Sequence, residues 1–240
     1  MSEKIWHLKR SDLFEQLSAD ELAQLEGRAR TRKFPRKALI YLPTDESEAV
    51  LLLAKGRVKI CNFTVDGKQA VFTLIEPGEL FGELAVIDSG ERDEYAEAIE
   101  DSLVILIPRD EMQRLMETHP KVTLGITRLL GLRRKLIQRR LNHLMFHSNR
   151  ERLVLLLLEL TERYGMNSGD GVRLDLKLSH QDLANLIGST RESVTVAMGE
   201  LQAAGLLRHA RRKIVLLDIP RMTRSVEGGV SARSPASSPP

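Results

Sequence analysis

The clearest pattern of apolar and polar positions runs over residues 178–207. Ser179 and Asp182, three residues apart, predict a capping box, in which side chains satisfy free backbone amides at a helix start. Gly188 ends this helix, and Gly205 ends a second one. Apolar residues recur at helical spacing in both, at Leu183, Ala184, Leu186, Ile187, Val194, Met198 and Leu201. Two short helices joined by a tight turn fit either a helix-turn-helix or an ordinary helical hairpin.

Short alternating runs separated by turns occupy residues 34–108. A helix is expected before them, over Asp12–Ala29. Turn dipeptides such as Asp66-Gly67 and Pro77-Gly78 separate the runs. The runs that we expect to be strands are Ala38–Tyr41, Ala49–Leu53, Arg57–Phe63, Ala70–Ile75, Ala96–Glu100 and Leu103–Pro108. Strands at this spacing predict a small antiparallel β-barrel or jelly roll.

A long helix is expected after Pro120, because apolar residues recur at steps of three and four residues as far as Leu144. A helix of this length with an apolar seam is typical of pairing with its copy in a homodimer. The alternative is packing against its own β domain, and both can hold on different faces. The residues that we expect in the dimer interface are Ile126, Leu129, Leu130, Leu136, Ile137 and Leu144.

The helix-turn-helix pattern is followed by a candidate wing. Leu153–Leu160 predicts a buried helix, Gly165–Gly171 a loop and Val172–Leu176 a strand. Leu207–Leu217 predicts a β-hairpin with a basic tip, which favours a winged helix-turn-helix over a plain hairpin. The segment from Arg221 onward, rich in Ser, Pro, Gly and Arg, is expected to be disordered. The fold class is α+β, with a sensor-like domain over 1–110, a dimerisation helix over 111–147, a winged helix over 148–219 and a disordered tail over 220–240.

Charge divides the chain at its middle. The net charge of all 240 residues is only +3, but residues 1–120 hold 16 Lys and Arg against 23 Asp and Glu. Residues 121–240 hold 20 against 10, and this positive half suits a polyanion. A basic run at Arg28–Lys37 interrupts the acidic half. It is explained by a solvated face or by a protein contact surface.

The single cysteine, Cys61, excludes a disulfide within one chain and an iron–sulfur cluster held by several thiolates of one subunit. Its alternating surroundings indicate a small buried side chain. No apolar run reaches transmembrane length and no signal peptide opens the chain, so we expect a soluble cytoplasmic protein without membrane contact. No P-loop, zinc-protease helix or Gly-x-Ser-x-Gly elbow occurs, so we expect no enzyme.

Two histidines, His143 and His147, are four residues apart and share a face of the long helix. Such a pair can bind a metal or haem in principle, but the sequence places no third ligand beside it. A position just before Ser148 favours a hinge between domains. His7 and Cys61 are isolated candidates for a haem ligand. We therefore expect no metal site and no certain cofactor.

Two specific motifs are GELFGELA at residues 78–85 and GSTRESV at residues 188–194. The first resembles the phosphate-binding cassette, and the second the start of the recognition helix, of the cyclic AMP receptor protein (CRP/FNR) superfamily of bacterial transcription regulators. The resemblance covers about residues 8–218. It implies a cyclic-nucleotide-binding-like β domain, a dimer helix and a winged helix, in a homodimer that binds palindromic double-stranded DNA and contacts RNA polymerase. The rival hypothesis is a nucleotide-sensing module that acts through protein contact.

The resemblance assigns the recognition helix to Thr190–Ala204. Arg191 and Glu192 would read base edges, and the chemistry agrees, since Arg binds guanine in bidentate fashion and Glu accepts from cytosine. Val196 stands where many members have a second base-reading Arg, so the half-site is expected to differ at that base pair. Thr195 completes the expected base contacts. The residues expected to contact phosphates are Ser179, Gln181, Thr190, Ser193 and Arg212.

This chain matches the effector-binding residues of the family less completely than it matches the DNA-binding residues. Arg92 would supply charge to a phosphate, but the neighbouring Ser of the family is Asp93 here, and its carboxylate repels a phosphate. The Thr-Ser pair that receives adenine in relatives is Ile137-Gln138 here. We therefore do not expect cyclic AMP to bind, and expect a different small-molecule effector or none. The candidate pocket residues are Gly82, Glu83, Leu84, Ala85, Arg92, Asp93, Arg133, Ile137 and Gln138.

Overall fold

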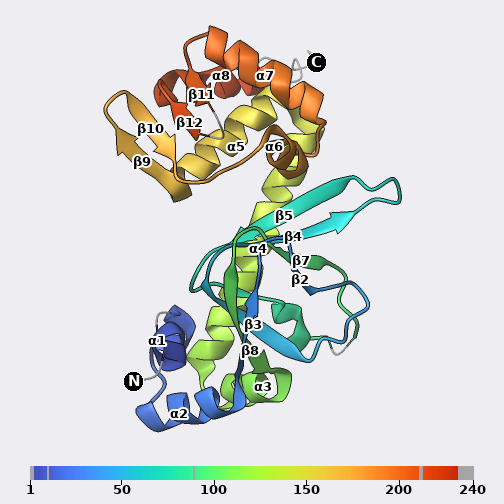
Figure 1. The fold of residues 1–240 in the computed structure, drawn as a ribbon, viewed down its shortest axis with the longest axis vertical. Coiled ribbons are helices and arrows are strands. Elements are labelled where there is room, and N and C mark those ends of the chain that lie inside the picture. Colours follow the sequence, from blue (N-terminus) through green and yellow to red (C-terminus); the bar gives the residue numbers. More distant parts are fainter. Residues whose placement is uncertain (1–2, 10, 89, 211–212, 232–240) are drawn as a thin grey trace, which may run out of the picture. The chain divides into compact units, whose positions relative to one another are not determined.

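The computed structural model describes residues 3–9, 11–88, 90–210 and 213–231 (Figure 1). The chain divides into two compact units, residues 1–135 and 136–240. The boundary falls inside one long helix, α4 (Pro120–Phe146). It therefore lies within the segment 111–147 that the sequence assigns to a dimerisation helix.

Two four-stranded antiparallel sheets form the centre of the N-terminal unit, with strand orders β1-β8-β3-β6 and β2-β7-β4-β5. They make a jelly-roll-like pair and do not close into one barrel. The six expected strands are present, each within a few residues of its expected position. The strands are β1 (Arg30–Phe34), β2 (Leu39–Tyr41), β3 (Ala49–Lys55), β4 (Val58–Phe63), β5 (Gln69–Ile75), β6 (Leu80–Phe81), β7 (Tyr95–Ala98) and β8 (Ser102–Pro108).

The side chains of β3 are apolar on both faces of the strand, and each face packs against a different core. Leu51 and Leu53 belong to a core that also contains Phe81 and side chains from the second sheet. Val50 and Leu52, which alternate with them, belong to a second core that is shared with the helices of the unit. Strand β3 is thus buried on both of its faces.

The helices of the N-terminal unit are α1 (Glu3–Lys9), α2 (Ala19–Arg28) and α3 (Arg109–Thr118), with 3-10 helices η1 (Asp12–Phe14) and η2 (Glu83–Val86). The expectation of one helix over Asp12–Ala29 is wrong, because a new helix starts at Ser18. The Ser18 backbone amide donates to Glu21 Oε2 at 2.9 Å, and Ser18 Oγ accepts from the Glu21 amide. This capping box fixes a helix start where the apolar spacing alone predicts continuity.

Strand β1 was missed in the basic run Arg28–Lys37. It pairs only with β8, at the edge of its sheet, and Arg30, Thr31, Arg32 and Lys33 are exposed. Charged side chains on an edge strand discourage pairing with other chains. The basic run therefore lies on an exposed edge strand, which fits either a solvated face or a protein contact surface.

Helix α4 carries its apolar residues in different environments. Val122 is buried, and Leu129 and Leu130 pack against the same core. Ile126, expected in the dimer interface, is only 1% exposed and packs inside its own unit, because its side of the helix faces that core. That expectation is wrong for Ile126. Ile137 is 58% exposed.

The C-terminal unit contains one antiparallel sheet of order β11-β12-β10-β9. The expected loop at Gly165–Gly171 is wrong in part, because β9 lies within it and pairs with β10. The expected hairpin at Leu207–Leu217 is present as β11 and β12. The elements are α5 (Asn149–Tyr164), β9 (Gly165–Ser168), β10 (Gly171–Leu174), α6 (His180–Ile187), α7 (Arg191–Ala203), β11 (Leu207–Ala210), β12 (Lys213–Leu216) and α8 (Ile219–Ser231).

Helix α8 corrects the expectation of a disordered tail from Arg221. Met222 and Val226, four residues apart, are buried, so a short apolar stripe suffices to hold the helix. The composition of the segment conceals this pair among Ser, Gly and Arg. Residues 232–240 of the expected tail lie outside the described residues. In the part of the chain that the structure describes, no helix has the length and apolarity needed to cross a bilayer.

Candidate nucleic-acid interface

Capping hydrogen bonds and a left-handed glycine define the ends of helices α6 and α7 and the turn between them. The Ser179 amide donates to Asp182 Oδ2 at 2.8 Å and the Asp182 amide to Ser179 Oγ at 3.1 Å, which is the expected capping box. Gly188 ends α6 with φ +63°, in the left-handed region that favours glycine. Thr190 caps α7, because its Oγ1 accepts from the Ser193 amide at 3.2 Å. The sequence therefore defines both ends of the turn.

Helix α7 has a buried face and an exposed face. Val194, Met198 and Leu201 are buried, as their spacing predicts. Arg191 and Glu192 are exposed, and neither side chain forms an ion pair or hydrogen bond within the described part of the chain. Thr195 and Val196 lie on the exposed side too, and Val196 is 62% exposed. All four side chains that the sequence assigns to base contacts are thus on the accessible face.

The expected phosphate contacts lie at the starts of α6 and α7, where backbone amides carry partial positive charge. Ser179 Oγ donates to Asp182 Oδ2 at 2.6 Å, and Thr190 Oγ1 donates to Ser193 Oγ at 3.0 Å. Gln181 donates from Nε2 to Asn185 at 2.8 Å. Arg212 lies outside the described residues.

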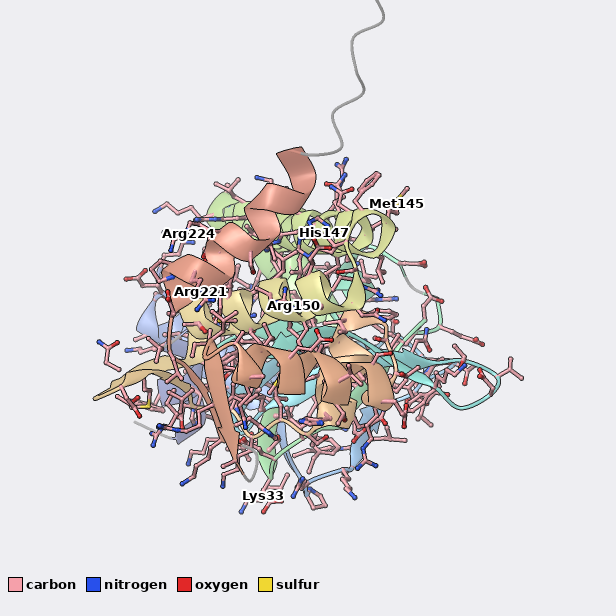
Figure 2. All side chains as sticks on the ribbon, turned by 90° about the horizontal axis from the view of Figure 1, so that it is seen from above. Lys33, Met145, His147, Arg150, Arg221 and Arg224 are labelled. Carbon is pink, nitrogen blue, oxygen red and sulfur yellow. The ribbon has the colours of Figure 1, made fainter. Side chains whose placement is uncertain are left out.

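Cations lie on other elements of this unit. Figure 2, seen from above, shows Arg150 of α5 and Arg221 and Arg224 of α8. In β11, Arg208 forms an ion pair with Asp170, with 2.5 Å between Nη2 and Oδ2. Arg150 is more loosely paired, since its Nε lies 3.6 Å from Glu200 Oε2. Arg221 and Arg224 are exposed, and exposed cations of this kind suit a polyanion.

His180 was not singled out from the sequence. It is the first residue of α6, and its Nδ1 lies 2.8 Å from Thr195 Oγ1 on α7. Its ring also packs at a tilt against that of His209 in β11, with 4.8 Å between ring centroids. The only sequence signal was its place directly after the capping residue Ser179. Through these two contacts, His180 connects α6 to α7 and to β11.

The N-terminal unit holds a second group of charged side chains, which we call the cassette cluster: Tyr41, Glu83, Arg92, Glu94 and Arg133. Glu83 follows Gly82, whose φ is +63°, and is 4% exposed. Arg133 donates to the Glu83 carboxylate and, at 2.5 Å, to the Leu80 carbonyl oxygen. A buried carboxylate is tolerated because the guanidinium compensates its charge.

Arg92 is held on the other side of the cassette cluster. Its Cζ lies 4.1 Å from the centroid of the Tyr41 ring, and its Nη2 donates to the Ala49 carbonyl oxygen at 2.7 Å. A Cβ added to Gly82 would lie 2.5 Å from Arg92 Nη1, so the guanidinium covers the turn that resembles a phosphate site. Tyr41 donates to Glu94 Oε1 at 2.9 Å. Burial is the main cause that raises the pKa of Glu94, opposed by the Tyr41 hydrogen bond.

Tyr41 and Glu94 were not among the expected pocket residues, although Glu94 lies next to Asp93 in the sequence. Asp93 itself is exposed, and its backbone oxygen accepts from Asn62 Nδ2 at 3.0 Å. Leu84 is exposed and Ala85 is buried. Ile137 and Gln138 are exposed on the part of α4 that belongs to the C-terminal unit.

The other candidate ligands are placed as follows. The rings of His143 and His147 meet edge to face with centroids 5.3 Å apart. Cys61 is buried in β4, and burial raises the pKa of its thiol to about 11. His7 is buried in α1. Among the described residues, no three His, Cys, Asp or Glu side chains are grouped so that they could hold a metal ion.

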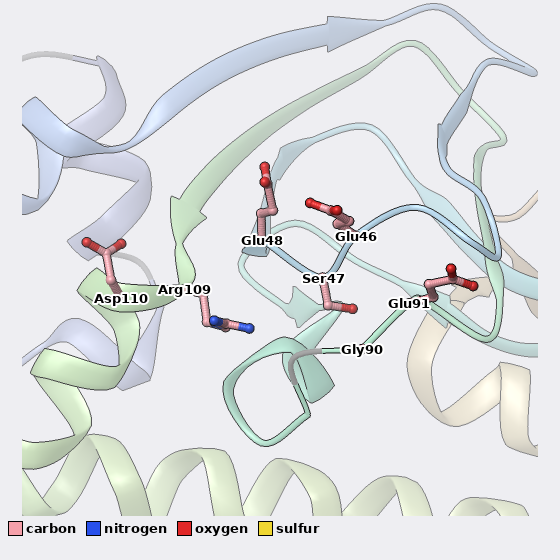
Figure 3. Close-up of a pocket in the computed structure, with 7 residues that line it drawn as sticks. All are labelled: Glu46, Ser47, Glu48, Gly90, Glu91, Arg109 and Asp110. Atoms are coloured by element: carbon pink, nitrogen blue, oxygen red, sulfur yellow. The ribbon is translucent and has the colours of Figure 1, made fainter.

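A separate cleft of about 650 Å³ lies in the N-terminal unit. Figure 3 shows Glu46, Glu48 and Glu91 around it, with the Arg109 side chain directed towards Ser47. None of its lining residues belongs to the cassette cluster. Its acidic rim does not suit a phosphate.

Comparisons with known proteins find matches for both the N-terminal β domain and the C-terminal helix-turn-helix unit. The cyclic nucleotide-binding domain matches residues 31–119, and the Crp-like helix-turn-helix domain matches residues 151–225. The global nitrogen regulator of Synechocystis sp. is 32% identical over 187 residues, which are 76% of this chain and 82% of that protein. The chain belongs to the CRP/FNR family. It is a CRP/FNR-type DNA-binding transcription regulator, and the relatives are transcriptional regulators, not enzymes.

Other CRP/FNR proteins extend the similarity over most of the chain. The CRP-like cAMP-activated global transcriptional regulator of Mycobacterium tuberculosis is 25% identical over 217 residues, 90% of this chain and 97% of that protein. The solved structure of TTHA1359, a CRP/FNR regulator from Thermus thermophilus, has a TM-score of 0.67 and 27% identity. It covers 82% of this chain and 98% of that one. The resemblance stated from the two motifs is therefore confirmed, and the CRP/FNR match includes the segments that hold α7 and most of the cassette cluster.

Proposed function

We propose that this protein is a homodimer that binds a palindromic DNA site through α7. The observation that carries the proposal is the start of α7, where Arg191 and Glu192 are exposed and unpaired among the described residues. A capped helix with free Arg and Glu side chains in its first turn suits insertion into the major groove. Two such helices in a dimer would enter grooves about 34–36 Å apart on one face of the DNA.

Base recognition in this proposal follows from side-chain chemistry. Arg191 would donate two hydrogen bonds to guanine, and Glu192 would accept one from cytosine. Val196 has no donor, so it would contact a thymine methyl group and give a half-site that differs from the usual family site at that position. Ser179, Gln181, Thr190, Ser193 and Arg212 would set the register through phosphates.

The dimer is proposed to form along α4. Its exposed apolar residues include Ile137, Leu141 and Leu144, at steps of four and three residues on one helix face. An exposed apolar stripe of this kind is typical of a helix that pairs with a copy of itself. Leu136 lies next to this stripe, and Leu129 and Leu130 would border it.

The β domain is proposed either to sense a small molecule other than cyclic AMP or, without an effector, to stabilise the dimer. Arg92 and Arg133, the cations that would meet a phosphate, already bind Tyr41, the Ala49 carbonyl oxygen and Glu83. The carboxylates of Glu83 and Glu94 would oppose a second anion. Among the named relatives, one is described as cAMP-activated and another as a global nitrogen regulator. Titration calorimetry is expected to detect no micromolar binding of cyclic AMP.

Selection from random DNA duplexes at two salt concentrations tests the main proposal. Enrichment of one palindrome at both concentrations is expected. Binding that is sensitive to salt but blind to sequence, or no binding, would favour the alternative of a regulatory module acting through protein contact. A regulator of this type would work in the cytoplasm and contact RNA polymerase.

Replacing Arg191 tests its assigned role directly. Arg191→Ala is expected to cost about 1–3 kcal/mol of binding and to relax one base position. Arg191→Lys is the matched variant, because lysine keeps the charge but lacks the bidentate geometry. It should retain affinity for random DNA and lose preference at the same position. An unchanged site preference in both variants would refute this assignment.

A further inference from the structure

A hydrogen-bond chain links α6 to the first turn of α7. Thr195 Oγ1 lies 2.8 Å from the Arg191 carbonyl oxygen and donates to it. A hydroxyl has one proton, so His180 Nδ1, 2.8 Å from the same Oγ1, must be the donor in the second contact. The order of donors is therefore His180 to Thr195 to the Arg191 backbone.

This order fixes the tautomer of His180. With its proton on Nδ1, the neutral ring carries a bare lone pair on Nε2. His180 Nε2 is buried and has no hydrogen-bond partner among the described residues. An unprotonated nitrogen there leaves no buried donor unsatisfied, whereas the other tautomer would leave one.

The ring of His180 is enclosed by neighbours from two other elements. The His209 ring of β11 packs against it at a tilt of 36°, and the His209 amide donates to Gln202 Oε1 of α7 at 3.2 Å. Burial, followed by the nearby His209 and Arg191, lowers the pKa of His180. The neutral ring is thus the form that suits this site at neutral pH.

We propose that His180 is a positioning residue for base recognition, which selects the Thr195 rotamer that α7 presents to DNA. Threonine in a helix divides between two χ1 rotamers, because its hydroxyl can bond a carbonyl of the preceding turn. Donation from His180 holds the hydroxyl towards α6 and commits its only proton to the helix backbone. This inference rests on the proposed function, in which Thr195 lies at the base-reading face.

Loss of the donor should change base preference. In His180→Ala, the Thr195 hydroxyl loses one of its two hydrogen bonds and keeps only the one to the Arg191 carbonyl oxygen, so it turns more readily towards a base. A neutral hydrogen bond of this kind corresponds to a change of about threefold to tenfold in discrimination at the affected position. His180→Asn is the rescue variant, because its amide nitrogen can donate from nearly the place of Nδ1. His180→Gln places its amide near Nε2 and should not rescue.

A double-mutant cycle separates this role from general packing. Thr195→Val removes the acceptor, so adding His180→Ala to it should change base preference no further. Selection with the full chain is the measurement. The inference is overturned if His180→Ala keeps the wild-type preference, if His180→Gln behaves like His180→Asn, or if the alanine effect is undiminished in the Thr195→Val background. If His180→Ala does not fold, the comparison of base preference between His180→Asn and His180→Gln decides the question.

A second readout does not depend on DNA. In the full chain with ¹⁵N-labelled histidine, NMR is expected to report the proton of neutral His180 on Nδ1, and a proton on Nε2 would overturn the inference. If the wild-type protein selects no DNA sequence, the proposed function fails. The tautomer still tests the hydrogen-bond chain in that case. The two failures are therefore distinguishable.

Discussion

Two of the arginine and glutamate pairs in this chain lie in opposite surroundings. On α7, Arg191 and Glu192 are exposed and form no side-chain bond with another described residue. In the cassette cluster, the Glu83 carboxylate is buried and forms an ion pair with Arg133. Charged groups that already satisfy one another gain little from a ligand, whereas exposed ones keep their full bonding capacity for a partner. At the residue scale, the first pair is suited to recognition and the second to structure.

Val196 offers a gain-of-function prediction at this scale. Its side chain is exposed, so Val196→Arg should be accommodated without disturbing the buried face of α7. A guanidinium there would add a bidentate donor, worth about 1–3 kcal/mol of discrimination in favour of guanine. Selection from random duplexes should therefore give a motif with a new guanine. Val196→Ala, which adds no donor, is the control, and a shared motif for all three proteins would contradict the prediction.

His143 gives a prediction about pH. Burial lowers its pKa first, and His147 and Arg139 add to the effect while Glu159 opposes it. A base whose pKa is depressed by folding contributes stability above its unfolded pKa of about 6.5. That stability is lost as the pH falls towards the lowered folded pKa. The expected result is a free energy of unfolding that decreases as the pH falls from about 7.5 through about 6.5.

Urea unfolding of the full chain, followed by circular dichroism, measures this decrease. His143→Gln has no titrating group at the position, so its stability should fall less over the same pH interval. An equal fall in wild type and variant would show that His143 contributes nothing to the pH dependence. Because the ring is only partly buried, the direction of the difference is the quantity to compare.

At the element scale, the sequence predicts where helices and strands lie better than what each one packs against. The repeat in α4 identifies the helix, but it does not distinguish buried Ile126 from exposed Ile137, because both obey the same spacing. Strand β1 lacks apolar alternation, since it is an exposed edge, and α8 needs only Met222 and Val226 to pack. Packing partners come from tertiary structure, which local periodicity does not encode.

The candidate sites show the same limit. Capping signals located the helix-turn-helix, because Ser179, Asp182, Gly188 and Thr190 act within a few residues of one another. His180 reaches Thr195, fifteen residues away, and no local signal announces that contact. Tyr41 likewise enters the cassette cluster from a strand far from Glu94 in the sequence. Contacts between elements were the part that sequence reasoning missed.

The exposed stripe on α4 leads to a prediction about assembly. Leu141→Glu should shift the protein from dimer to monomer, because it places a charge where an apolar contact is proposed. One buried leucine is worth about 1.5–3 kcal/mol, and a two-fold dimer would lose two, roughly 3–6 kcal/mol in total. Sedimentation velocity over a concentration series measures the shift. Asn142→Glu adds the same charge at a neighbouring exposed polar position and should remain dimeric.

At the scale of the whole molecule, the two halves of the chain differ in charge as well as in structure. The first 120 residues carry the excess of Asp and Glu, and the remainder carries the excess of Lys and Arg. A polyanion is therefore attracted to the half that contains α7 and repelled by the half that contains most of the cassette cluster. This separation favours contact with DNA through the C-terminal unit alone. Dimer formation would then double the number of cations that contact DNA.

The salt dependence of binding measures that doubling. Each phosphate neutralised on duplex DNA adds about −0.9 to the slope of log K against log salt concentration. The wild-type dimer on a palindrome should therefore show about twice the slope of the Leu141→Glu monomer on the same duplex. A duplex with one half-site should reduce the affinity of the dimer and leave that of the monomer nearly unchanged. Equal slopes for both proteins on the palindrome would mean that only one subunit contacts DNA, against the proposed geometry of two recognition helices.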